Sequence, residues 1–413
     1  MAISAEACSE VIRVFDSQGW HRTATEVDLQ SGRWLVDTLS MMGVEARAVP
    51  FPFSRIDASE CVVSAGDFRV AAVQTMDSGL PPPNTTIRGV FGQGSIDLVR
   101  VQSHGVAAEL DGIRRSNCKA IVAAVAGHPG GTTLLNAWGY DKPDGVPVVQ
   151  VPETAWEALV GAREAGAPVE VRCGGTRTAT TGVNALAVVP GKRRSLPPVV
   201  VLTPRSGWWH CAGERGGGLA IWLEVARTAD QLGLDRDLIF LATTGHELGF
   251  LGIKRYFDSD PDLARRAFAW IHLGANIGAA GAQLMIRASD QGLLTVAREL
   301  APAFGAIFPS PLFATTDRPV GEAGEVLVRG GRFISLVGAN APLFHSTLDR
   351  WPDAVDFGVV ATAADGVARR RPRKRRGRTS TSAAARVERS YPSRPRSSTA
   401  SSMSPGWRKP CRA

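Results

Sequence analysis

The spacing of hydrophobic and polar positions changes along the chain and predicts two kinds of structure. Near the N-terminus, residues 4–18 and 31–39 carry apolar side chains at helical intervals, which predicts two short helices, the second ending near Gly43. Residues 66–178 carry short alternating apolar runs separated by Gly and Pro, which predicts a small β-rich domain with one helix near 153–164. Its strands are expected at 68–73, 94–99, 119–125 and 146–151.

From about Asn184 onward the pattern changes to strands that alternate with helices. Buried strands are expected at 198–202, 237–242, 268–273 and 332–337, and helices at 219–226 and 247–257. Strands that are apolar on both faces and alternate with helices are typical of a sheet covered on both sides. The predicted fold class is therefore α/β, with a mostly parallel mixed sheet flanked by helices. In such sheets the ligand site lies at the carboxyl ends of the strands.

The pattern divides the chain into four parts. They are an N-terminal part of the main domain at 1–65, an inserted β-rich domain at 66–178, the rest of the main domain at 179–367, and a basic tail at 368–413. The tail is rich in Arg, Ser, Pro and Ala without apolar periodicity, which predicts disorder. A translated frameshift of a GC-rich gene is the interpretation we favour for it. The alternative is phosphate contacts to nucleic acid or an acidic membrane through residues 371–378.

The charge of the chain is concentrated in this tail. The net charge is +8, but residues 369–413 hold fifteen Lys/Arg and one Glu, a local charge of +14. The remaining residues hold 32 basic and 38 acidic side chains, a charge of −6. A mildly acidic body does not favour nucleic acid as a partner outside the tail. The apolar content of 44% fits a soluble protein that is long enough for two domains.

Targeting signals and cysteine patterns are not evident. Residues 1–6 lack the basic and apolar regions of a signal peptide, and no apolar run reaches the length of a membrane span. The six cysteines are scattered without a CxxC pair, so we expect a cytoplasmic protein with reduced thiols and no cysteine-based metal cluster.

Two stretches at predicted strand ends carry metal-capable side chains. In residues 245–250 the order Gly-His-Glu-Leu-Gly-Phe excludes the HExxH zinc motif, because Phe250 stands where the second histidine would be. His246 and Glu247 remain as adjacent polar side chains before a helix, where Glu247 alone could simply complement the helix dipole. The other stretch contains His345, which on its own could be a structural loop histidine.

A third candidate, Glu214, precedes a run of three glycines. Alone it could form an ion pair or a helix cap, and the glycines could cradle a phosphate at the helix start. The Walker A pattern is absent and GxGxxG does not fall in a βαβ frame, so a nucleotide site is not expected. Together Glu214, Glu247 and His345 provide two carboxylates and an imidazole, a three-ligand set for one zinc ion with an open position.

The segment between the strand at 198–202 and Glu214 adds candidate pocket residues. They are Ser206, Trp208, Trp209 and His210. The two tryptophans fit a hydrophobic wall better than substrate stacking. His210 or His272 could supply a fourth metal ligand, although His272 lies in a buried strand and is more simply a core histidine. Ser206 and Cys211 lack the turn pattern of a covalent nucleophile.

The order of these motifs resembles the co-catalytic zinc aminopeptidases and carboxypeptidases of metallopeptidase clan MH, which include bacterial leucyl aminopeptidase and glutamate carboxypeptidase. Residues 184–191 resemble the family's N-V-x-A-x-x-x-G strand, and residues 245–252 resemble G-E-E-x-G-L-x-G. Residues 344–347, followed by Asp349 and Asp356, resemble Y-H-T-x-x-D.

The resemblance covers about residues 10–50 and 180–360. It implies a zinc aminopeptidase-like fold, and it implies that the β-rich domain between these segments is the protease-associated domain often inserted there. By resemblance, the family's bridging aspartate falls on Glu214, its second-zinc glutamate on Glu247 and its closing histidine on His345. These three would form the protein ligand set of one of the two zincs.

The other half of the two-zinc site departs from the family pattern. The family's H-x-D ligands fall on Thr203-Pro204-Arg205, and a later acidic ligand falls near Gly274, so neither position offers a ligand. The family's general-base glutamate falls on His246, which can act as a base near neutral pH. Arg205 could bind a substrate carboxylate, stabilise an oxyanion or neutralise an inactive site.

The resemblance therefore implies a divergent, zinc-dependent hydrolase that acts on a peptide or related amide at a chain end, with one metal, His246 as base and Arg205 as a substrate-orienting cation. The alternative is a catalytically inactive homologue, a pseudoenzyme that serves as a binding or interaction protein. Loss of the first zinc's ligands favours the second hypothesis, and survival of the other three favours the first. Whether the chain is an enzyme, its substrate, exopeptidase polarity and oligomeric state stay open.

Overall fold

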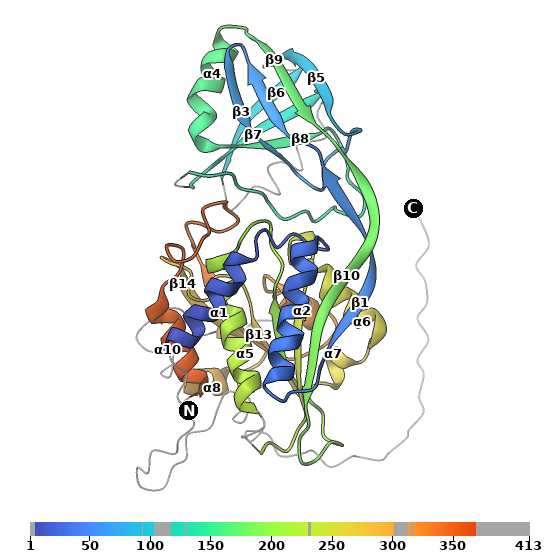
Figure 1. Cartoon of the computed structure of the whole chain (residues 1–413), viewed down its shortest axis with the longest axis vertical. Helices are drawn as coiled ribbons and strands as arrows, with labels where there is room; N and C mark the ends of the chain where they lie inside the picture. The colour runs from blue at the N-terminus through green and yellow to red at the C-terminus, as the bar shows by residue number, and fades with distance from the viewer. Residues whose placement is uncertain are drawn as a thin grey trace, which may run out of the picture.

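The computed structural model describes residues 5–92, 94–102, 117–128, 130–229, 233–300, 313–314 and 317–368. Nearly all of the basic tail expected at 368–413, which begins at Ala368, lies outside the described residues. A large lower unit contains one broad sheet with helices, and a smaller β-rich unit lies above it (Figure 1). No helix in the described part of the chain has the length and apolar character needed to cross a membrane.

The large unit is built on an eight-stranded mixed sheet. In spatial order its strands are β1 (Ala46–Ala58), β10 (Gly175–Val189), β12 (Leu238–Thr243), β11 (Val199–Pro204), β13 (Ala269–Leu273), β16 (Phe333–Ala339), β14 (Gln283–Ala288) and β15 (Phe313–Ala314). The central strands β12, β11, β13 and β16 run parallel, whereas β1, β10 and β14 introduce antiparallel pairs. The prediction of an α/β fold with a mixed sheet flanked by helices is confirmed.

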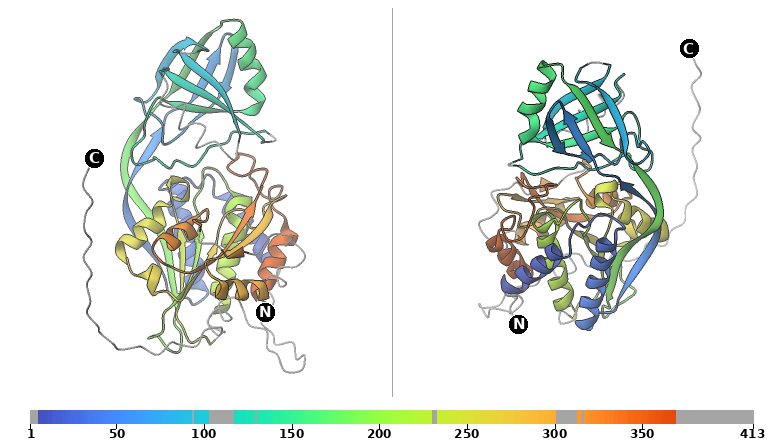
Figure 2. Two further views of the ribbon diagram at one scale, coloured as in Figure 1. Left: turned by 180° about the vertical axis from the view of Figure 1, so that it is seen from behind. Right: turned by 45° about the horizontal axis from the view of Figure 1, so that its top comes forward.

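Helices cover both faces of this sheet (Figures 1 and 2). One face carries α1 (Ala5–Ser17), α2 (Glu26–Met41), α5 (Gly217–Ala229) and α10 (Phe357–Ala368). The other carries α6 (Leu251–Ser259), α7 (Leu263–Arg266) and α9 (Glu322–Val328), while α8 (Gln291–Leu300) packs beside β14 and β16. The apolar residues of β11 are buried on both faces of the sheet. Val199 and Val201 pack in the core on the α5 side, whereas Val200 and Leu202 pack in the core on the α6 side. Alternating side chains of a strand point to opposite faces.

The small unit lies between β1 and β10 in the sequence. One of its sheets holds β3 (Phe68–Ala71), β2 (Val62–Ala65), β9 (Pro168–Cys173) and β5 (Thr85–Val90). The other holds β4 (Val73–Gln74), β8 (Val148–Pro152), β7 (Ala120–Ala126) and β6 (Ile96–Gln102), and α4 (Trp156–Glu164) packs on this unit. The expected domain boundary at residue 66 falls after β2 rather than before it.

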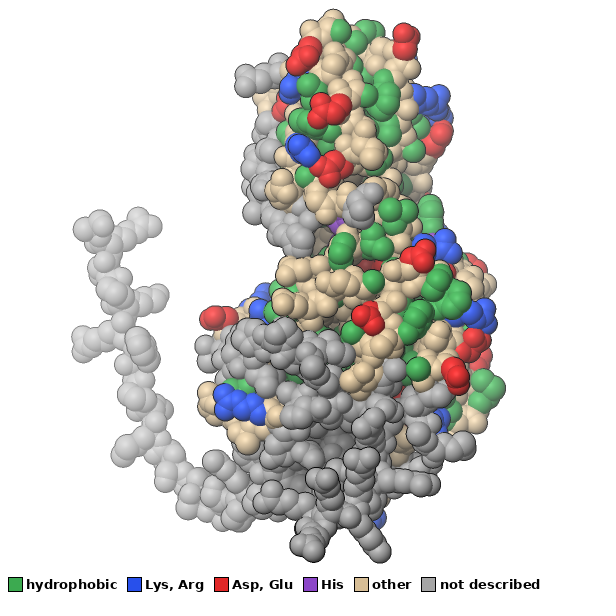
Figure 3. All heavy atoms as spheres, turned by 90° about the vertical axis from the view of Figure 1, so that its left-hand side faces the viewer, with side chains coloured by type: hydrophobic (Ala, Val, Ile, Leu, Met, Phe, Trp, Pro, Cys, Tyr) green, Lys and Arg blue, Asp and Glu red, His purple; other side chains and the backbone are tan. Residues whose placement is uncertain are grey.

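A long two-stranded ribbon joins the two units. Strands β1 and β10 pair continuously from Ala46 with Ala187 to Ala58 with Gly175, and they run from the main sheet into the small unit (Figure 1). Between the units the molecule narrows, and a histidine side chain is visible from outside in this region (Figure 3). Strand β10 runs from the small unit into the main sheet, and β12 is antiparallel to it, so the carboxyl ends of β12 and of its parallel neighbours β11 and β13 lie at the end of the sheet that faces the small unit (Figure 1).

Candidate metal centre

The turn after β12 presents His246 and Glu247 from a short 3-10 turn, His246–Leu248. Gly245, Gly249 and Phe250 all have left-handed backbone angles, with φ of 75°, 75° and 62°. These angles separate the turn from α6, which begins at Leu251. Glu247 therefore precedes the helix instead of forming its first turn, and its carboxylate is directed toward other parts of the fold.

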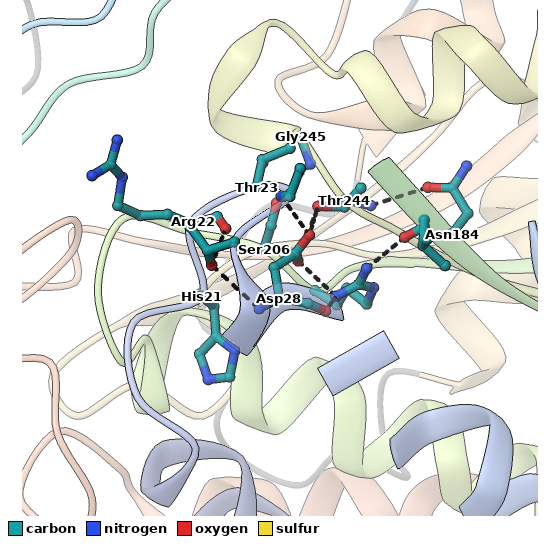
Figure 4. A network of polar contacts seen from close by, with 12 residues as sticks. His21, Arg22, Thr23, Asp28, Asn184, Ser206, Thr244 and Gly245 are labelled. Carbon is teal, nitrogen blue, oxygen red and sulfur yellow. Dashed lines mark hydrogen bonds and ion pairs between the residues drawn. The ribbon is translucent and has the colours of Figure 1, made fainter. Parts of the chain in front are cut away.

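Hydroxyl groups hold both carboxylate oxygens of Glu247, which is completely buried. Thr23 Oγ1 donates to Oε1 at 2.6 Å, and Ser206 Oγ donates to Oε2 at 2.8 Å. Ser206 Oγ also accepts from Gly245 N at 2.7 Å. Figure 4 shows Thr23 next to Ser206 and Gly245, although these residues come from three distant segments. Each carboxylate oxygen has a further lone pair, so these hydrogen bonds leave Glu247 capable of binding a metal.

Glu214 lies on a wide π-helical turn, Ala212–Gly216, that leads into α5. The turn follows Cys211, whose φ is 59°, and π turns of this kind occur frequently at functional sites. The carboxylate of Asp349 stabilises the turn, because it accepts from Gly213 N at 2.6 Å and from Glu214 N at 3.0 Å. The Glu214 side chain is thereby fixed in the interior.

Glu214 and His345 face each other. His345 Nε2 lies 3.4 Å from Glu214 Oε1, and both side chains are buried. His345 is held by its backbone, since Trp209 Nε1 and Leu134 N donate to its carbonyl oxygen at 2.8 and 3.3 Å. The neighbouring Arg215 places Nη2 at 2.6 Å from the same Glu214 oxygen. Neither carboxylate oxygen of Glu214, nor His345 Nε2, has a partner with hydrogen-bond geometry in the described structure.

The charges in this cluster are strongly perturbed. Burial opposes ionisation of Glu214, but Arg215 and His345 outweigh it and hold the pKa of this carboxyl at about 2. Burial, together with the charge of Glu214, raises the pKa of Asp349 to about 7. Burial also raises the pKa of the Cys211 thiol well above its usual value. Glu214 is therefore the anionic donor of the cluster, and Cys211 is a neutral thiol.

The three predicted ligands are not among the described side chains that cluster most closely by a 4.8 Å criterion, except for Glu214. In the part of the chain that the structure describes, one group of His, Cys, Asp or Glu side chains has its ligand atoms all within 4.8 Å of one another: Cys211, Glu214 and Asp349. Glu214 and His345 fit a zinc ion in chemical type, as a buried carboxylate and an imidazole without hydrogen-bond partners. Ser206 links Glu247 to this pair by hydrogen bonds. Its hydroxyl donates to Glu247, and its carbonyl oxygen accepts from Arg215 Nε at 2.6 Å.

His246 belongs to a second, connected group. Its Nδ1 lies 2.8 Å from Glu322 Oε1, and the other Glu322 oxygen lies 3.2 Å from His272 Nε2. Ser335 Oγ holds His272 Nδ1 at 2.8 Å, so this strand histidine is buried and hydrogen-bonded on both nitrogens. Burial opposes the charge of Glu322, but the two imidazoles hold its pKa far below the ordinary range.

A cavity of about 270 Å³ opens beside these histidines. Its lining is mainly apolar and includes Phe344, Met285 and Val337 together with His246 and His272. A mostly apolar concave site with a few polar groups is typical of a small-ligand site. The four pocket residues expected from the sequence, Ser206, Trp208, Trp209 and His210, do not line this cavity.

Those four residues have other contacts. Ser206 bonds Glu247, and Trp209 Nε1 donates to the backbone of His345, so both support the metal-capable side chains. Trp208 is buried, and Trp209 packs edge-on against Trp20. His210 Nδ1 lies 2.7 Å from Asp16 O at the end of α1.

Arg205 is completely buried and is held by groups from α2 and β10. Its Nη1 donates to the carboxylate and to the carbonyl of Asp28, both at 2.7 Å, and its Nη2 donates to Val183 O. Thr244 Oγ1 donates to the same Asp28 carboxylate (Figure 4). These contacts occupy the guanidinium internally. They offer no support for the expectation that Arg205 faces a substrate.

The glycine run after Glu214 is required by close packing. A Cβ atom on Gly217 would lie 1.7 Å from Ile277 O, and one on Gly216 would lie 2.7 Å from a methyl group of Ile12. Gly218 would approach Thr203 Oγ1 to 3.1 Å.

Replacing Gly217 by alanine should therefore lower the free energy of unfolding by about 1–3 kcal/mol, because backbone must move to admit the methyl group. Gly161→Ala in α4 is a matched control, since a Cβ there meets nothing within 4 Å and alanine is the better helix former. Chemical denaturation monitored by circular dichroism measures both. Equal stability of the two variants would show that the packing around Gly217 yields easily.

The small unit also contacts the site. Ala137 N donates to Glu247 O at 2.8 Å, and Thr132 N donates to Thr347 Oγ1 at 3.0 Å. With the bond from Leu134 N to His345 O, residues 132–137 thus hold the backbone of both metal-capable stretches. The segment inserted between β7 and β8 is therefore part of the site's structural support.

Comparisons with known proteins agree with this architecture. No known protein-family profile matches the chain. Aminopeptidase YwaD of Bacillus subtilis (strain 168) is 29% identical over 126 residues, which span 29% of this chain and 27% of that relative. The aligned region is thus about a quarter of the length of the curated relative.

Solved structures align over most of the chain. A peptidase M28 precursor from Shewanella amazonensis SB2B has a TM-score of 0.72 and 15% identity, covering 88% of this chain and 93% of its own. The zinc aminopeptidase BSAP from Bacillus subtilis has a TM-score of 0.70, 15% identity and the same coverages. An aminopeptidase from Aneurinibacillus sp. strain AM-1 has a TM-score of 0.63 and 19% identity, covering 88% and 92%. The fold is that of the zinc aminopeptidases.

Proposed function

We propose that this chain is a peptidase-like hydrolase that cleaves a peptide or related amide at a chain end with one zinc ion, held by Glu214, Glu247 and His345. The observation that carries the proposal is the pair Glu214 and His345, whose Oε1 and Nε2 atoms lie 3.4 Å apart, buried and without hydrogen-bond geometry to any described partner. Arg215 forms an ion pair with Glu214 Oε1, but Glu214 Oε2 and His345 Nε2 have no hydrogen-bond partner among the described residues. Buried polar atoms without such a partner are costly, which favours a bound cation beside them.

When bound, zinc supplies Lewis-acid chemistry that activates a water and polarises a carbonyl. The chain's own residues supply the rest. Glu247 joins the ligand set through a carboxylate that Thr23 and Ser206 orient. His246 acts as the general base: Glu322 holds Nδ1, which leaves Nε2 to take a proton. The apolar cavity beside His246 accepts a side chain of the substrate.

Two further roles belong to this proposal. Arg205 anchors the end of β11 to α2 through Asp28 and does not touch the substrate. The small β-rich unit is a protease-associated-like insertion, and its residues 132–137 position the turn of Glu247 and the loop of His345. In this reading the inserted unit supports the site directly.

A catalytically inactive homologue that binds a peptide is the second candidate, and Arg215 is the observation that favours it. This fully buried guanidinium lies 2.6 Å from Glu214 and already neutralises the carboxylate. The described group of metal-capable side chains whose ligand atoms lie within 4.8 Å of one another contains Glu214 but neither Glu247 nor His345, which points the same way. Both candidates use the same cavity and differ in whether a metal binds.

Metal analysis tests the proposal. Purified protein should retain about one equivalent of zinc, whereas Glu214→Gln and His345→Ala should each fall below about a tenth of an equivalent, because each loses a ligand. Glu10→Gln, an exposed acid on α1, is the control and should keep the wild-type content. Mass spectrometry of the metal, with reconstitution in added zinc, measures this. Wild-type protein that stays below a tenth of an equivalent after reconstitution would exclude the metal centre.

A substrate panel then separates the two candidates. Peptides with a free N-terminus and peptides with a free C-terminus are assayed with and without added zinc. Metal-dependent release of the terminal residue supports the hydrolase. Saturable peptide binding by calorimetry with no turnover under either condition supports the inactive homologue.

A further inference from the structure

We propose that Arg215 is a built-in cation that competes with the metal for Glu214 and thereby sets the metal affinity of the site. The inference rests on the proposed metal centre, but its test has separate outcomes. The ion pair expected as an alternative role for Glu214 is present, and Arg215 is its partner.

Burial and contacts place the Arg215 guanidinium inside the acidic cluster. Its side chain is 0% exposed, and Nη2 lies 2.6 Å from Glu214 Oε1, the oxygen that also lies 3.4 Å from His345 Nε2. The π turn Ala212–Gly216 directs two successive side chains, Glu214 and Arg215, into the interior. The carboxylate oxygen nearest to the histidine is therefore the oxygen that Arg215 already contacts.

The charge of Arg215 cannot be removed by a proton transfer, because guanidinium groups stay protonated in proteins. A divalent cation that binds Glu214 and His345 must therefore approach a permanent positive charge in a region without solvent. Repulsion at such distances is strong when water is excluded. The metal must either tolerate the guanidinium or displace it.

Apart from its ion pair with Glu214, the Arg215 guanidinium has one hydrogen bond among the described residues. Its Nε donates to Ser206 O at 2.6 Å, but Nη1 and Nη2 have no partner with hydrogen-bond geometry among the described residues. Arg205 is equally buried but differs from Arg215 in its partners. Its guanidinium donates to Asp28 and to Val183 O, and Asp28 is not a proposed metal ligand. Of these two buried cations, Arg215 alone shares its carboxylate with the metal centre.

Zinc titration of the full chain by isothermal calorimetry, with a competing chelator, tests the inference. Arg215→Met should bind zinc at least roughly tenfold more tightly than wild type, because the competing charge is gone and the side-chain volume is largely kept. Arg215→Lys keeps the charge and should stay closer to wild type than the methionine variant does. Arg227→Met, which removes the partner of Glu224 on the same helix α5, should leave the affinity unchanged.

The outcomes distinguish the inference from the proposed function. Equal zinc affinity in wild type and Arg215→Met overturns the inference and leaves the metal centre standing. If Arg215→Met binds zinc and the wild-type protein does not, the inference is supported and the proposed zinc-dependent function of the wild-type protein is excluded. No binding by either protein overturns both. If Arg215→Met folds only with zinc, recovery of its native circular dichroism on adding one equivalent supports the inference, and failure to recover overturns it.

Discussion

Arg205→Met should lower the free energy of unfolding by about 3–5 kcal/mol, since it leaves the Asp28 carboxylate buried without its cation. Asp28 is completely buried, and the remaining donors to its carboxylate are Thr244 Oγ1 and Ala24 N. The loss also frees Val183 O, which accepts from the guanidinium. Chemical denaturation of the purified variant measures the effect.

A double-mutant cycle and a surface pair provide the controls. Arg205→Met combined with Asp28→Asn should recover about 2 kcal/mol of the single-variant loss, because the amide carries no charge but still accepts from Ala24 N. Arg33→Met, on the same helix as Asp28, removes an exposed pair with Glu26 and should change stability little. If Arg205→Met is as stable as Arg33→Met, the buried pair contributes nothing to the fold.

Arg205→Met also distinguishes the two roles considered for Arg205, a structural anchor and a cation that orients the substrate. A structural anchor predicts that activity per folded molecule changes little below the unfolding transition. A substrate-orienting cation predicts a large rise in KM for peptides with a free carboxylate, with stability close to wild type. The hydrogen bonds to Asp28 and Val183 O favour the first outcome.

The central strands were predictable because their environment is encoded locally. Val199 to Leu202 are all apolar, which is expected only where both faces of a strand are covered, and the structure buries them alternately against α5 and α6. The helix predicted at 247–257 begins later, at Leu251. Left-handed angles at Gly249 and at Phe250 delay it, and a non-glycine residue such as Phe250 gives no sequence signal for this conformation.

No strand was expected at 46–58, a segment that contains Pro50 and Pro52. The strand is at the edge of the sheet and pairs only with β10, with Pro50 opposite Val183 and Pro52 opposite Thr181. Prolines two residues apart place both missing N–H groups on the same side of the strand, where an edge strand has no partner. The two prolines are therefore compatible with the β1–β10 ribbon that joins the two units, although proline is uncommon in strands.

The site residues were predictable as candidates but not as partners. Strand-end position identified His246, Glu247 and His345, because ligands bind there in parallel sheets. Nothing in the sequence links His246 to Glu322 or Glu247 to Thr23, which lie 76 and 224 residues away. Such pairings depend on tertiary packing, and the acid at the start of α9 is locally indistinguishable from an ordinary helix-dipole acid.

The pair of His246 and Glu322 predicts a large effect on the rate of peptide hydrolysis. His246→Ala should lower kcat for peptide hydrolysis by about 10²- to 10⁴-fold while zinc content stays at the wild-type level, because the base is lost but no ligand is. Glu322→Gln should lower kcat less and leave KM nearly unchanged, since Glu322 contacts His246 through Nδ1 and His272 through Nε2 and takes no proton itself. Steady-state kinetics with metal analysis of each variant measures both.

Glu325→Gln gives the matched control for this pair. Glu325 lies on the same short helix, is equally buried, and its carboxylate faces Arg318 and Arg329 instead of a histidine. Its variant should lose stability without changing kcat per folded molecule. Turnover that survives in His246→Ala would remove the imidazole from the reaction. Equal losses of kcat in Glu322→Gln and Glu325→Gln would mean that α9 acts through folding, so that the orientation of His246 by Glu322 contributes nothing specific.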